Sequence, residues 1–81
     1  MRTPGTRVLD DTGDMLKPGE YARRGGIWHG CGPTGLLANL GAHQVVEHDD
    51  GTISVQPSIL VSDGQGAQWH GYLERGIWRE C

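Results

Sequence analysis

Two histidines and two cysteines have the side chains and the spacing of a candidate metal site: His29, Cys31, His70 and Cys81. His29 and Cys31 are two residues apart, so on an extended strand both side chains project from the same face. If the two pairs come together, they form a tetrahedral Cys2His2 zinc site, which would stabilise a small β-domain. Two other states fit the same residues: a disulfide between the cysteines, or free thiols beside ordinary imidazoles. His43 and His48 are either substitute ligands or half-exposed strand residues.

Three of the four residues, His29, Cys31 and Cys81, belong to a repeated stretch, and His70 lies two residues before its second copy. Residues 21–31 read YARRGGIWHGC and residues 72–81 read YLERGIWREC, so Tyr, Arg, Gly, Ile, Trp and Cys recur in the same order, with one glycine added in the first copy. Each copy has the pattern of a β-hairpin, with a short aromatic arm, a glycine-containing reversal and an Ile-Trp arm rich in β-formers.

The turns set the register that we expect in each hairpin. With Arg75-Gly76 as a two-residue turn, Leu73 faces Trp78 and His70 faces Cys81. With residues 24–26 as a three-residue loop, Ala22 faces Trp28 and Tyr21 faces His29. The second hairpin therefore makes His70 and Cys81 cross-strand neighbours.

Further strand signals lie between the two copies. Asp50-Gly51 predicts a tight hairpin turn, under which Val46 opposes Val55 and His48 opposes Ile53. Residues 34–41 have helical character and predict one or two helical turns. We therefore expect an all-β fold, in which antiparallel hairpins form a small barrel or sandwich with one short helix. It is a single domain over residues 1–81, with residues 1–10 as an extended N-terminal arm.

Five aromatic residues form a second candidate site, which would be an exposed strip that binds sugar or peptide. They are Trp28, Trp69, Trp78, Tyr21 and Tyr72. The alternative is that these rings are the core, because the chain contains no Phe to fill it.

Composition narrows the class of protein. The 81 residues include 14 glycines, and a core this lean indicates help from a metal, a disulfide or a partner surface. A net charge of −3 argues against a nucleic-acid partner. Residues 32–64 hold four acidic residues and no Lys or Arg, which indicates either a solvated edge or a surface for a basic partner. The sequence shows no run of about 20 apolar residues for a membrane span and no secretory signal, and its two cysteines indicate a reducing compartment.

No recognisable catalytic apparatus is present in the sequence. Cys31 and His29 project from the same face but lack a third group to orient the histidine, and Ser58 lies in no GxSxG elbow. The chain also lacks a phosphate-binding loop and a dinucleotide fingerprint. We therefore expect a protein that is not an enzyme.

The stretch TISVQPSILVSDGQGAQWHGYLERGIW resembles a family of small phage and bacterial proteins of unknown function. The family has a Pro-Ser-Ile stretch, then a His followed by a hydrophobic strand, then a Gly turn; the matching positions are Pro57, Ser58, Ile59, His70, Gly71, Tyr72 and Gly76. The resemblance implies an origin in tailed phages of actinobacteria and, through longer cysteine-rich relatives, a structural zinc.

Two functional hypotheses follow. The first is a bacteriophage structural or accessory protein that binds the capsid or self-assembles, as a capsid decoration or minor capsid protein, in the virion or the host cytoplasm. The second is a zinc-stabilised interaction module or an inhibitor of a host protein.

Overall fold

The structure is a computed structural model that describes residues 2–81. Over these residues it contains strands and no helix. The strands are β1 (Arg2–Pro4), β2 (Thr6–Arg7), β3 (Glu20–Arg24), β4 (Ile27–Cys31), β5 (Leu37–Asn39), β6 (Gln44–Glu47), β7 (Ile53–Ser62), β8 (Gln68–Glu74) and β9 (Ile77–Glu80).

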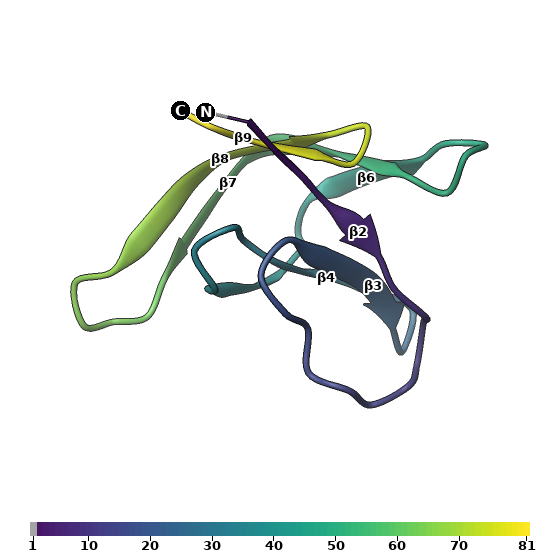
Figure 1. Cartoon of the computed structure of the whole chain (residues 1–81), viewed down its shortest axis with the longest axis horizontal. Helices are drawn as coiled ribbons and strands as arrows, with labels where there is room; N and C mark the ends of the chain where they lie inside the picture. The colour runs from purple at the N-terminus through teal and green to yellow at the C-terminus, as the bar shows by residue number, and fades with distance from the viewer. Residues whose placement is uncertain (1) are drawn as a thin grey trace.

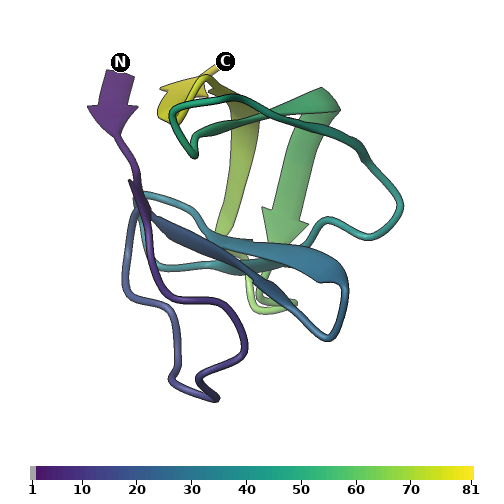
Figure 2. The ribbon, with the colours of Figure 1, turned by 90° about the vertical axis from the view of Figure 1, so that its right-hand side faces the viewer.

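The strands form two sheets around a shared core. Sheet A has five strands in the order β1-β9-β8-β7-β6, and sheet B has four in the order β2-β3-β4-β5. Neighbouring strands are antiparallel except β2 and β3, which are parallel. Figures 1 and 2 show the two layers, with the β7–β8 hairpin extending past the edge of sheet B. The expected all-β class is therefore confirmed.

The N-terminal segment joins both sheets. β1 pairs with β9 at the edge of sheet A, and β2 pairs with β3 at the edge of sheet B. Gly5 lies between them, and its N–H donates to the carbonyl of Gly76 at 2.7 Å. Residues 2–7 are thus extended, and each half is a paired edge strand.

Trp78 of β9 occupies the centre of the core. Its Nε1–H donates to the carbonyl of Gly19 at 2.9 Å, and its ring lies edge-on to Trp69, with centroids 5.5 Å apart. The far end of the indole reaches Gly30 on β4, where a Cβ would lie 2.8 Å from Cη2. The buried residues of this core come from both sheets and the segment after β5: Tyr21, Leu40, Ile53, Val55, Ile59, Trp69, Leu73 and Trp78.

The second repeated hairpin has the register that the sequence predicts. Leu73 pairs with Trp78 and Tyr72 with Arg79, around a turn in which Arg75 and Gly76 both have positive φ. Beyond the ladder, the Cys81 N–H donates to the His70 carbonyl at 3.0 Å.

The register expected for the first hairpin is wrong by one residue. Ala22 pairs with His29 and Tyr21 with Gly30, because Gly25 and Gly26 alone form the turn, with φ of 61° and 81°. A two-residue hairpin turn of this kind needs positive φ at both positions, which glycine adopts without steric cost. In the second copy the turn is Arg75-Gly76. In the first copy the added glycine takes the place of the arginine in the turn, and Arg24 stays in strand β3.

The register expected around Asp50-Gly51 is also wrong by one residue. Val45, and not Val46, pairs with Val55. The His48 N–H donates to the Thr52 carbonyl at 2.8 Å, so the loop takes three residues and ends in Gly51 at a φ of 88°. Val45 consequently packs against the core, whereas Val46 faces outward and is 50% exposed.

The short helix expected over residues 34–41 is absent, and β5 takes its place. The Gly32 N–H donates to the Leu36 carbonyl at 2.9 Å, which closes a tight turn directly before this strand. From Leu36 to Leu40 the side chains alternate between half-buried or buried and exposed, with a period of two. The spacing of Leu36 and Leu40 suits one face of a helix, but it also places both side chains on one face of a strand, while Leu37 faces the other way and is 52% exposed.

We predict that Gly30→Ala lowers the free energy of unfolding by about 1–3 kcal/mol, because the new methyl group would displace the Trp78 ring. Gly32→Ala is the matched control: its Cβ would lie 3.7 Å from its nearest neighbours, an ordinary contact. Denaturant titrations of both variants measure the difference, and equal stabilities would contradict the tight packing of Trp78 on β4.

Candidate functional site

One of the two candidate ligand pairs is brought together. His70 Nε2 lies 4.0 Å from Cys81 Sγ and 2.9 Å from Ser58 Oγ on the outer face of sheet A. Both side chains are exposed. No hydrogen bond to the other ring nitrogen of His70 occurs within residues 2–81, so no residue there orients the imidazole as a catalytic base would require.

The other pair lies on the far side of the molecule. Cys31 is buried with Leu16 and Ala22 in a small cluster on the outer face of sheet B, opposite the face on which Gly30 meets Trp78. His29 pairs with Ala22 and so shares that outer face. Burial raises the pKa of the Cys31 thiol, and both cysteines are free.

The structure therefore does not bring the four expected ligands together. Residues 2–81 contain no group of three or more His, Cys, Asp or Glu side chains placed to hold a metal ion. The remaining histidines each contact serine: His43 Nε2 lies 3.3 Å from the Ser58 carbonyl, and His48 Nε2 lies 2.8 Å from Ser54 Oγ.

The five aromatic residues divide between the core and the surface. Tyr21, Trp69 and Trp78 are at most 2% exposed and belong to the core. Trp28 and Tyr72 are half-buried on different sheets. The described chain thus presents two separate aromatic residues and not a continuous strip.

Each half-buried ring is covered by arginine. The guanidinium carbons of Arg7 and Arg23 lie 4.9 and 5.6 Å from the Trp28 ring centroid. Arg79 lies 4.7 Å from the Tyr72 centroid and donates two hydrogen bonds to Glu74. Tyr72 also lines a polar groove of about 810 Å³ on the outer face of sheet A, together with Gln44, Gln56 and Ser58.

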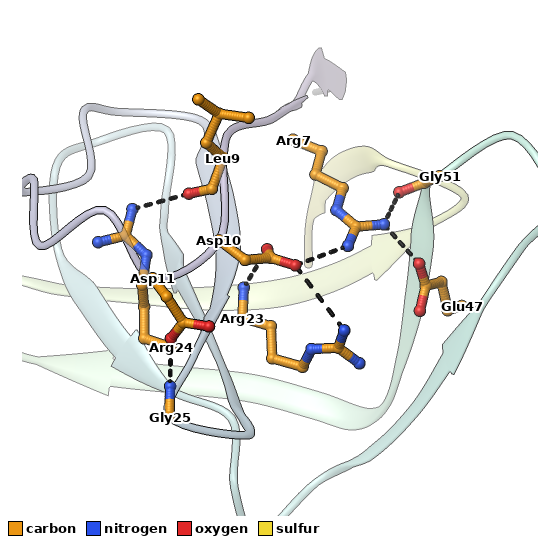
Figure 3. A network of polar contacts seen from close by, with 9 residues as sticks. All are labelled: Arg7, Leu9, Asp10, Asp11, Arg23, Arg24, Gly25, Glu47 and Gly51. Atoms are coloured by element: carbon orange, nitrogen blue, oxygen red, sulfur yellow. Dashed lines mark hydrogen bonds and ion pairs between the residues drawn. The ribbon is translucent and has the colours of Figure 1, made fainter.

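A more clearly organised surface is the segment between β2 and β3, residues 8–19, which we call the 8–19 loop. Asp10 is its anchor: one carboxylate oxygen accepts the Arg23 backbone N–H at 2.9 Å, and the other accepts Arg7 Nη2–H at 3.1 Å (Figure 3). Asp11 accepts the Gly25 N–H at 2.7 Å.

Arg24 holds the loop from within. Its guanidinium donates to the carbonyls of Asp14 at 2.8 Å and Leu9 at 3.4 Å. The buried Leu16 packs against Ala22 and fixes the returning arm. These contacts give the loop a defined shape although it contains no helix or strand.

Leu9 and Met15 project from this loop into solvent. They are 78% and 79% exposed, more than any other large hydrophobic residue described, and both line a hollow of about 450 Å³. Figure 3 shows the Leu9 side chain pointing away from the hydrogen-bonded network. Two apolar side chains held outward on an ordered loop form a surface that another protein can bury.

Sequence reasoning missed these two residues. The available signal was the position of each residue beside acidic ones, Leu9 before Asp10-Asp11 and Met15 after Asp14, in a segment without strand alternation.

Comparison with known proteins gives no relative: no family model, curated protein or solved structure matches the chain. Over residues 2–81 there is no helix of the length and apolarity needed to cross a membrane.

We predict that Asp10→Asn lowers the free energy of unfolding by about 1 kcal/mol at neutral pH and reduces its dependence on acid. The pKa of the Asp10 carboxyl lies below its ordinary value of 3.8, first because it accepts the Arg23 backbone N–H and then because Arg7 donates to it. A carboxyl with a lowered folded-state pKa stabilises the protein above its unfolded-state pKa, and this contribution is lost as the pH falls through the folded-state value.

Thermal melts between about pH 5 and about pH 2 measure this effect. Asp49→Asn is the control, since no side-chain hydrogen bond of Asp49 occurs within residues 2–81. A wild-type acid dependence that persists unchanged in Asp10→Asn would show that the anchor carboxylate does not stabilise the fold.

Proposed function

We propose that the protein is a non-enzymatic structural or accessory protein that docks on a larger protein assembly through the 8–19 loop. The observation that carries this proposal is the outward placement of Leu9 and Met15 on a loop held by Asp10, Asp11 and Arg24. A small domain with a lean core gains nothing in stability from such exposed side chains, whereas a partner surface can bury them.

The free energy available from burying Leu9 and Met15 supports a function in protein binding. Full burial of a Leu or Met side chain contributes about 1.5–3 kcal/mol. Because the loop is already ordered by its own hydrogen bonds, binding would lose little further conformational entropy. Two such anchors are typical of the few residues that supply most of the energy in a protein interface.

The assembly that we propose is the capsid of a tailed phage, with the protein as a decoration or minor capsid protein. Its basis is the resemblance of residues 52–78 to small phage proteins, together with the acidic balance of the chain, which favours a basic partner surface. The zinc-stabilised alternative lacks a supporting observation, because Cys31 and His70 lie on the outer faces of different sheets.

Quantitative mass spectrometry of purified virions tests this proposal. We expect a fixed copy number relative to the major capsid protein, at a multiple set by the capsid symmetry. Absence of the protein from the particles would refute the capsid assignment.

For the docking loop, we predict that Leu9→Ser with Met15→Ser reduces co-sedimentation with capsids at least about tenfold, because two apolar anchors are lost. Stability should change little, since both side chains are mostly exposed. Leu60→Ser is the matched control: Leu60 is 64% exposed but lies on sheet A. Undiminished binding by the double variant would place the docking surface elsewhere.

A further inference from the structure

The four outer edges of the two sheets differ in how far they are protected against pairing with another strand. At β1, Pro4 has no N–H to donate, and Arg2 adds a charge. β2 has only two residues, and β5 lies close to β7 of the other sheet. β6 has four residues, Gln44–Glu47, without proline, and the charge of its Glu47 is paired with Arg7. Figure 1 shows it at the outer end of sheet A.

The hydrogen-bond pattern fixes which backbone groups of β6 are free. The His48 N–H donates to the Thr52 carbonyl at 2.8 Å, so His48 and Thr52 form a hydrogen-bonded pair. In an antiparallel ladder such pairs alternate, which directs the backbone groups of Gln44 and Val46 toward β7 and those of Val45 and Glu47 outward. The edge of β6 therefore offers two N–H and two C=O groups to a further strand.

We propose that β6 is a self-association edge, at which a second copy of this chain pairs antiparallel about a twofold axis at Val46. The two five-stranded sheets then form one continuous sheet. This inference does not depend on the proposed capsid function, because it uses a different surface from the 8–19 loop.

The outward backbone groups allow three twofold registers, and charge selects among them. An axis at Glu47 places two glutamates directly opposite each other, which is destabilising. An axis at Val45 places the apolar Val46 opposite the polar Gln44 of the second copy, so the two valines at position 46 do not meet. With the axis at Val46, each Val45 pairs with Glu47 of the second copy through backbone hydrogen bonds, and no like charges are opposed.

The same register buries the exposed side of Val46. This side chain lies on the outer face of sheet A and is 50% exposed, and its partner in β7 is the polar Ser54. Across the twofold axis, the two Val46 side chains become a close cross-strand pair of β-branched residues. One apolar pair and four backbone hydrogen bonds form a small interface, so the dimer is concentration-dependent.

The test is a charge exchange at position 46, followed by sedimentation at about 100 µM. Val46→Lys and Val46→Glu each place like charges across the axis, and we expect each variant to be monomeric, with association weakened at least about tenfold. A mixture of the two variants pairs Lys with Glu and recovers a heterodimer. Val46→Thr, which keeps the β-branched shape, retains the wild-type dimer and controls for strand propensity.

Cross-linking provides a second readout. In the Cys81→Ser background, Val46→Cys forms an intermolecular disulfide under oxidising conditions, because Cα atoms of such a cross-strand pair lie about 4.5 Å apart. Gln44→Cys in the same background does not cross-link, since it faces His48 of the second copy. A wild-type monomer at about 100 µM, a dimer unaffected by Val46→Lys, or equal cross-linking of the two cysteine variants would each refute the proposal.

Discussion

Insertion of the Trp78 indole between the two sheets is the contact on which the rest of the fold depends. The ring belongs to sheet A, but its Nε1–H bonds to the carbonyl of Gly19 and its far edge touches Gly30 of β4. Gly5 also approaches the indole nitrogen, where a Cβ would lie only 2.8 Å away. Two glycines, Gly5 and Gly30, thus make room for one tryptophan, which helps a chain without Phe and with 14 glycines to form a closed core.

A polar network also links the two sheets. Arg7 on β2 donates to Asp10 in the 8–19 loop and to Glu47 and the Gly51 carbonyl on the β6–β7 hairpin (Figure 3). The same guanidinium lies over Trp28 of β4. Because these ion pairs are partly exposed, each contributes little by itself, but together they fix the position of the loop that carries Leu9. The core and the proposed docking surface are therefore connected through one arginine.

The sequence predicted the strand class and the second repeated hairpin, because Arg75-Gly76 left a single reasonable two-residue turn. The registers predicted for the other two hairpins are wrong because the sequence left their turn lengths ambiguous. The first hairpin turns through the two residues Gly25-Gly26, where three were expected, and the loop that ends in Gly51 has three residues, where two were expected. A shift of one residue moves every side chain to the opposite face. For this reason Tyr21 faces the core while His29 and Cys31 face away from it. The expected zinc ligands are separated because His70 and Cys81 lie on the outer face of the other sheet. Long-range packing, such as that of the loop around Arg24, leaves no local pattern in the sequence.

The pairing of β1 with β9 has a consequence for synthesis on the ribosome. β1 is made first, but its partner strand, and with it Trp78, emerges only after nearly the whole described chain. Until then β1 has no strand to pair with, and the glycine-lined space at the centre of sheet B is unfilled. Final closure must therefore wait until β9 has been made, and contacts this distant along the chain are formed slowly compared with local hairpins. During that interval a nascent chain would expose its unpaired first strand to chaperones or to neighbouring nascent chains.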